Sequence, residues 1–241
     1  MKKSVAAMVI GLAVGLGLSN VSKADERAWR WSPLGVGIAA PLQLPFISSD
    51  IYGLRFGGFF GYNHDVYGLD AGVCEITSGD FAGLQCDAFS WTEGSVYGVQ
   101  LGAVANVIAG KMYALQAGLV NVVWDDVWGV QLGAVNYDAN FRGLQVGGIV
   151  NWNNTASAGL EIGLVNANQD EFYGWAFGGL VNYSDSFKGF GCGVVNVAYE
   201  VTGFQLGVVN ACDRMHGVQI GLINMICESK LPIMTVMNAS F

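Results

Sequence analysis

The sequence has few charged residues, and basic residues are the scarcer kind. Lys, Arg, Asp and Glu together make up 12% of the 241 residues, whereas about 25% is typical of a soluble domain. Eleven residues are basic and 19 are acidic, which gives a formal net charge of −8. Because binding to a phosphate backbone needs basic patches, this balance argues against a nucleic-acid partner.

Beyond the N-terminus, the chain has no long apolar run and no segment with helical periodicity. A membrane-spanning helix needs roughly 20 consecutive apolar residues, so these absences argue against a helical membrane protein. The mean hydropathy is nevertheless positive, at +0.41, and 35 residues are glycine. Transmembrane β-barrels combine these properties, because their apolar face is spread over alternate residues.

Cysteine and histidine are also scarce, and neither forms a recognisable site. The five cysteines are odd in number and include no CxxC pair, so no metal or other cofactor is predicted. Their pairing stays open, and we interpret them as small apolar side chains on strands. His64 and His216 lie near turns without a Ser or Cys nucleophile motif. We therefore predict no catalytic residue; the lesser alternative, an outer-membrane lipid hydrolase, would lose activity on replacement of either histidine.

The N-terminus has the layout of a secretory signal. Lys2 and Lys3 precede the uncharged apolar stretch 6–18, and Ser22-Lys23-Ala24 places small residues where signal peptidase cleaves. We predict a signal peptide at residues 1–24 and a single β-repeat domain at residues 25–241. The alternative is a short N-terminal anchor that stays attached.

A repeat with a period of 14 to 16 residues covers most of the remaining chain. One representative unit is Gly129-Val-Gln-Leu-Gly-Ala-Val-Asn136. Units start at Gly53, Gly68, Gly83, Gly98, Ala114, Gly129, Gly143, Gly159, Gly174, Gly189, Gly203 and Gly217. Short polar segments such as 153–155 and 169–171 separate the units and have the composition of turns.

Within each unit the residues alternate between two types. One parity is uniformly apolar, whereas the other reads Gly, a polar residue, then Gly again. Strict alternation with β-branched residues predicts strands and an all-β fold. The polar parity holds Arg55, Asp70, Gln85, Asp87, Gln100, Gln116, Gln131, Gln145, Glu161, Gln205 and Gln219, and lapses at Ala176 and Gly191.

Two architectures are compatible with identical strand-turn units. The favoured one is an antiparallel transmembrane β-barrel of about 14 strands, each roughly long enough to cross a membrane. In it the apolar parity would face lipid, aromatic residues such as Tyr97, Trp128 and Tyr173 would lie near an interface, and the polar parity would line the lumen. The alternative is a parallel β-solenoid, in which the Gln and Asn residues would stack into ladders.

The repeat resembles bacterial surface-repeat proteins built from tandem Gly-Leu-Gln-Ile-Gly-Leu-Val-Asn-like units. The match covers residues 53–224, and 231–238 is similar to the family's terminal unit. The resemblance implies a location in the bacterial envelope and no defined activity. The ending Thr235–Phe241 also resembles the signal by which the barrel assembly machinery recognises its substrates, with Phe241 as the key residue.

These observations predict a non-enzymatic protein of the outer membrane. Its role would be structural or passive permeation, like a porin, with membrane lipid and the barrel assembly machinery as partners. The polar parity would then form a girdle that sets ion selectivity. The alternative function is a surface-exposed or periplasmic β-solenoid that acts as a binding module.

Overall fold

The computed structural model describes residues 31–39, 42–45 and 49–241, and its regular elements are all β-strands. They are β1 (Trp31–Ala39), β2 (Leu42–Leu44), β3 (Asp50–Asn63), β4 (Val66–Thr77), β5 (Phe81–Thr92), β6 (Val96–Ile108), β7 (Met112–Asn153), β8 (Ser157–Leu206), β9 (Val209–Ile226) and β10 (Ile233–Ser240). Among the described residues there is no helix of a length and hydropathy suited to crossing a membrane. The predicted signal peptide lies outside the described residues.

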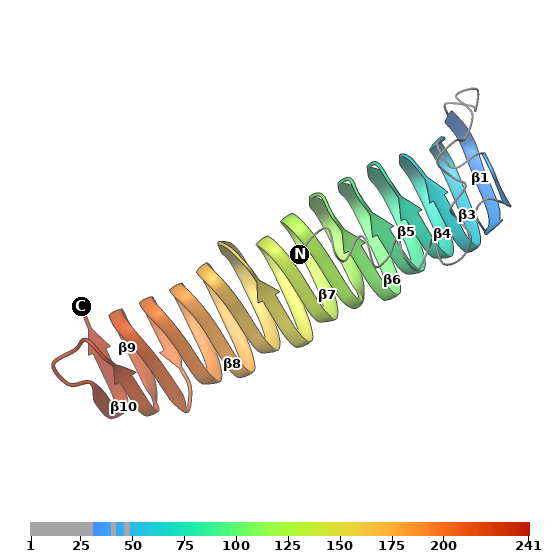
Figure 1. Cartoon of the computed structure of the whole chain (residues 1–241). Coiled ribbons are helices and arrows are strands. Elements are labelled where there is room, and N and C mark those ends of the chain that lie inside the picture. The colour runs from blue at the N-terminus through green and yellow to red at the C-terminus, as the bar shows by residue number, and fades with distance from the viewer. Residues whose placement is uncertain (1–30, 40–41, 46–48) are drawn as a thin grey trace, which may run out of the picture.

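The chain winds into coils that stack one beside the next along a single axis (Figure 1). Neighbouring coils pair in parallel from β1 and β3 through to β8 and β9. Equivalent residues of successive repeats lie opposite one another, as Gly83 does with Gly98 and Gln85 with Gln100. β7 and β8 continue through several coils without a break and contain 42 and 50 residues. The fold is a parallel β-solenoid.

The prediction of an antiparallel barrel is therefore wrong, and the solenoid alternative is confirmed. Antiparallel pairing occurs at the two ends of the described sheet, where β2 pairs with β1 and β10 with β9. The physical reason lies in the near-constant repeat length, which brings identical residues of successive coils into register. In-register stacking lets side-chain amides bond to copies of themselves, an arrangement that antiparallel neighbours would not produce along the whole chain.

Each coil points a short series of side chains into its interior. In one coil of β7 the buried side chains include Phe141, Gln145, Asn151 and Asn153. Repetition turns these positions into four buried columns: one apolar, one mainly glutamine, one asparagine and one of mixed type. The apolar column, which includes Val96, is buried along its whole length and is interrupted by one polar residue, Ser157. The core is therefore apolar on one side and rich in amides on the other.

Close stacking at the start of each repeat unit depends on one column of glycines. Eleven glycines of this column have a positive φ, and Ala114 occupies the twelfth position with φ 124°. A Cβ atom added to Gly143, where φ is 141°, would lie 2.0 Å from the carbonyl oxygen of Gly129 in the preceding coil. Because L-residues rarely adopt this conformation and a Cβ atom would meet the preceding coil, glycine is strongly favoured at this position.

Candidate functional site

The residues predicted to line a barrel lumen instead lie inside the solenoid. All eleven are buried, with exposed fractions of 6% or less. Between Gln85 and Gln145 they form a ladder in which each Nε2 donates to the Oε1 of the preceding glutamine, at 2.7 to 3.0 Å. The structure places these residues in the packed core and not around a lumen, and Gln205 and Gln219 form a separate pair beyond Ala176 and Gly191.

The N-terminal end of this column is charged. The guanidinium of Arg55 donates to both carboxylate oxygens of Asp70, and Arg55 Nε lies 3.3 Å from Glu75 Oε2. Burial, partly offset by the charge of Arg55, raises the pKa of Glu75 to about 8. Burial and the neighbouring Asp70 raise the pKa of Asp87 to about 7. The four side chains form a buried cluster of one guanidinium and three carboxyl groups at this end of the glutamine ladder.

Two further buried acids, Asp138 and Glu161, lie in the middle of the polar columns. Burial raises the pKa of Glu161 to about 8. Burial also holds the pKa of Asp138 well above its usual range, although Gln131 and Gln145 donate to its carboxylate. Asn153 and Asn168 donate to the two carboxylate oxygens of Glu161. Neither acid has a cationic partner among these contacts, so both favour the protonated form inside the core.

An asparagine column, which the predicted site did not include, runs without interruption through nine successive coils. It contains Asn106, Asn121, Asn136, Asn151, Asn166, Asn182, Asn196, Asn210 and Asn224, each bonded to the next at 2.8 or 2.9 Å. Most of these amides also donate to a backbone carbonyl, as Asn136 does to Val146. The sequence shows this column as an asparagine that recurs at one position of successive repeat units.

Replacing Asn136 with alanine is expected to lower the free energy of unfolding by about 2 kcal/mol, because buried amide partners would be left unsatisfied. Asn136 Nδ2 donates to Val146 O and to Asn151 Oδ1, and its own Oδ1 accepts from Asn121. Urea denaturation of the variant and the wild type measures the difference. A change below about 0.5 kcal/mol, the range of ordinary surface substitutions, would contradict a stabilising role for the ladder.

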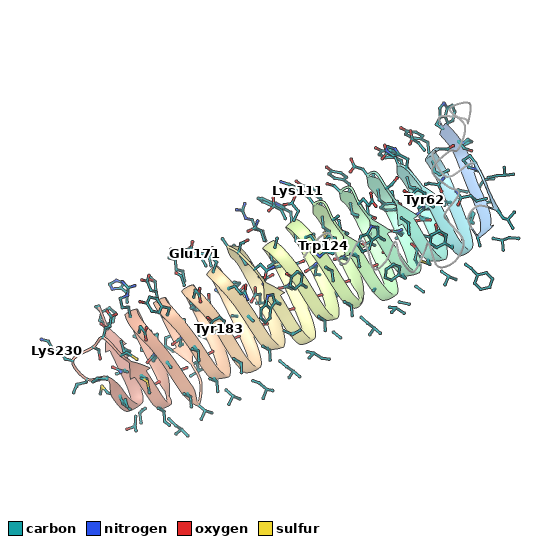
Figure 2. The ribbon with its side chains drawn as sticks, in the orientation of Figure 1. Tyr62, Lys111, Trp124, Glu171, Tyr183 and Lys230 are labelled. Atoms are coloured by element: carbon teal, nitrogen blue, oxygen red, sulfur yellow. The ribbon has the colours of Figure 1, made fainter. Side chains whose placement is uncertain are left out.

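The apolar residues of each repeat unit face outward, and together they form one exposed edge of the solenoid. We define the apolar edge as the nine segments that join the glutamine column to the asparagine column, from 101–105 to 220–223. These segments contain Gly, Ala, Val, Leu, Ile, Phe and Cys and no charged or amide residue. Their large side chains are open to solvent: Leu119 is 57% exposed, Ile149 56% and Leu222 68%. Figure 2 shows carbon-only side chains projecting along this side of the solenoid.

Charged residues are concentrated in the turns along the opposite edge, where Figure 2 labels Lys111 and Glu171. Lys111 pairs with Asp126 at 2.8 Å, and Lys188 pairs with Glu171. Two residues after Lys111, Asp126 and Glu171 come the outward-facing Tyr113, Trp128 and Tyr173. Aromatic side chains therefore lie between the charged turns and the aliphatic rows on this face.

Some of the aromatic residues stack from coil to coil. The rings of Tyr52 and Tyr67 are 5.0 Å apart and nearly parallel, as are those of Tyr97 and Tyr113 at 5.1 Å. The outer surface thus changes from charged turns, through an aromatic row, to an apolar edge. The aromatic position is interrupted in some coils, where Ala82, Arg142 and Ala158 replace the aromatic residue.

The remaining predicted residues lie at or near the ends of the solenoid. Phe241 follows β10, is 87% exposed and contacts the ring of His216. Its predicted role in barrel assembly presupposed a barrel, so that role has no support in the fold. His64 lies in the turn between β3 and β4, with its Nδ1 3.0 Å from Asp50 Oδ1.

Comparisons with known proteins do not identify a family for this chain. A scan against protein-family models and searches of curated proteins and of solved structures found no match. Stacked coils with a repeat of about 15 residues are observed, as in the pairing of Gly83 with Gly98. Membership of the surface-repeat family stays a prediction from the sequence.

Proposed function

We propose that the protein is a binding module of the bacterial envelope that lies on a membrane surface with its apolar edge inserted into one lipid leaflet. The observation that carries the proposal is the apolar edge itself, which is exposed and uncharged in nine successive coils. At about 4.8 Å per coil, the edge extends for roughly 40 Å. Exposed apolar surfaces of this extent mark interaction sites in soluble proteins.

Lipid suits this edge better than a protein partner does. A protein interface has a polar rim with about one hydrogen bond per 100–200 Å², and the apolar edge has no polar side chain that could supply one. A lipid leaflet requires no such partners. Parallel pairing between coils occupies backbone N–H and C=O groups on both sides of the edge, with a break in register within the edge segments, and paired backbone is the condition for placing strands in hydrocarbon.

The order of side chains across the coil matches the layers of a membrane interface. Helices that lie in the interface bury their apolar face about 5–10 Å deep, and Tyr and Trp favour the headgroup level. With the apolar edge in the acyl region, Tyr97, Trp128 and Tyr173 would lie nearer the headgroups and the charged turns in water. Because the turns are mainly acidic, the attraction would come from apolar burial and not from anionic lipid.

Vesicle flotation tests this proposal. Protein purified from expressing cells should float with phosphatidylcholine vesicles, and the triple variant Leu119→Lys, Ile149→Lys, Leu164→Lys should remain at the bottom of the gradient. A control with the same added charge on the turns, Ala156→Lys, Gln169→Lys, Ser186→Lys, should float like the wild type. Thermal melts would establish that both variants fold.

Two results would contradict the proposal. Equal flotation of the wild type and the Leu119/Ile149/Leu164 variant would show that the apolar edge does not bind lipid. Failure of the wild type to float, together with a dimer in sedimentation that the same variant dissociates, would show that the edge binds a second copy instead. For the cellular location, fractionation should recover the wild type with envelope membranes.

A further inference from the structure

One cluster of metal-ligating atoms lies apart from the apolar edge, at the N-terminal end of the charged turns. Asp50 begins β3, and His64 and Asp65 connect β3 to β4. His64 Nδ1 lies 3.0 Å from Asp50 Oδ1 and 3.5 Å from Asp65 Oδ1, and all three ligand atoms lie within 4.8 Å of one another. Two successive coils thus bring one imidazole nitrogen and two carboxylates together at the surface.

These separations fit a zinc ion. Zinc binds His nitrogen and carboxylate oxygen at about 2.0–2.2 Å in tetrahedral geometry, so neighbouring ligand atoms lie roughly 3.3–3.5 Å apart. The two distances from His64 Nδ1 are close to this range. All three side chains are partly exposed, with His64 55% open to solvent. An ion could therefore reach them without any opening of the core.

The backbone of the following coils holds the two carboxylates in place. Asp50 Oδ1 accepts a hydrogen bond from the amide of Asp65, and Asp65 Oδ1 accepts one from the amide of Asp80. Hydrogen bonds of this kind orient metal ligands and commonly affect affinity about 10- to 100-fold. The second oxygen of each carboxylate is left to share in binding.

Of the turns that precede β4, β5 and β6, only the first contains a histidine. The residues before Asp80 and Ser95, which are equivalent to His64, are Gly79 and Gly94. A Cβ atom added to Gly79 would lie 1.8 Å from Asp65 Oδ1, so this position directly borders the carboxylate of the preceding coil. At His64 the same position contributes a nitrogen ligand beside Asp50. The recurring aspartates are a structural feature of the turns. The combination of an imidazole nitrogen with two carboxylate oxygens is specific to this coil.

We propose that Asp50, His64 and Asp65 form a binding site for one zinc ion, with the fourth position open to water. Binding would displace the Nδ1 proton where one is present and would join the first two coils of the solenoid through their turns. The proposal is independent of membrane docking, because the ligands lie on the charged edge and not on the apolar edge.

Calorimetric titration of the full-length mature protein with Zn²⁺ tests the site. The wild type should bind one equivalent, and His64→Ala and Asp65→Asn should each weaken binding at least about 10-fold. Asp65→Asn preserves an oxygen that can accept from the Asp80 amide, so the turn should stay folded. Asp80→Asn is the control. It removes the carboxylate at the equivalent position of the next coil, where the preceding residue is Gly79 and not histidine, and it should bind zinc like the wild type.

Free thiols are the competing zinc ligands, and Cys86 and Cys227 are the exposed cysteines of the described residues. Cys86→Ser and Cys227→Ser should each leave the affinity unchanged. The proposal fails if His64→Ala binds zinc as tightly as the wild type, or if either cysteine variant abolishes binding. A second readout is thermal stability: zinc should raise the melting temperature of the wild type and of Asp80→Asn, but not that of His64→Ala.

Discussion

Replacing Gly143 with valine is expected to destabilise the solenoid by about 4 kcal/mol or more, because backbone strain and overpacking act together. Gly143 has a φ of 141°, and its Cβ position lies 2.0 Å from the carbonyl oxygen of Gly129. The neighbouring coil cannot move away locally, since it is hydrogen-bonded to coils on both sides. Urea denaturation followed by circular dichroism measures the effect.

Gly148 provides a matched control in the same coil. A Cβ atom there would meet nothing closer than 3.7 Å, and the equivalent positions of other coils include Val194 and Val208. Gly148→Val should therefore change the stability little. Ala114, the one non-glycine in the positive-φ column, gives the reverse test: Ala114→Gly should stabilise the protein. Similar stabilities of the Gly143 and Gly148 variants would mean that coil spacing does not depend on the glycine column.

The buried acid Glu161 is expected to make the protein more stable as the pH falls from about 8 to 5. Its pKa is about 8 in the folded chain, against about 4.3 in an unfolded one. Folding must therefore take up a proton at neutral pH. Stability is highest below the unfolded pKa, declines as the pH rises between the two values, and levels off above the folded pKa.

Glu161→Gln should remove the part of this dependence that Glu161 contributes and stabilise the protein by roughly 3–4 kcal/mol at pH 7, from about 1.4 kcal/mol per pKa unit. A glutamine there matches the column and could donate to Gln145 Oε1 as its neighbours do, while its single oxygen keeps one of the two bonds that Asn153 and Asn168 donate to Glu161. The measurement is the free energy of unfolding of the variant and the wild type at several pH values. Their difference should grow from pH 5 to pH 8.

Glu171 is the control, because it is an exposed acid paired with Lys188. Glu171→Gln should give a small difference that does not grow with pH. The pair of Lys111 with Asp126 acts in the opposite direction, since the hydrogen bond from Lys111 lowers the pKa of Asp126 and its contribution is lost in acid. A constant difference between Glu161→Gln and the wild type across the range would show that Glu161 is ionised in the folded protein.

Much of the fold followed from the repeat. The alternation in each unit predicted strands, and the spacing of units predicted equivalent structural repeats. The polar parity was expected to line a barrel lumen and lies instead in the packed core. The predicted antiparallel barrel was wrong, because a strand with one polar and one apolar parity suits both a barrel and a solenoid. Asp138 could not be recognised in advance, since it lies in a segment with turn composition and only the coil geometry buries it.

The sequence by itself determined the all-β architecture, the period of about 15 residues in which Gly83 and Gly98 are equivalent, and the segregation of apolar from polar side chains. These depend on local chain geometry, in which alternate residues point to opposite faces. Only the tertiary structure decided that neighbouring units run parallel and that Gln131 bonds to Gln116. It also decided that the apolar segments form one continuous edge. These properties depend on contacts between coils, which the order of residues within one coil does not specify.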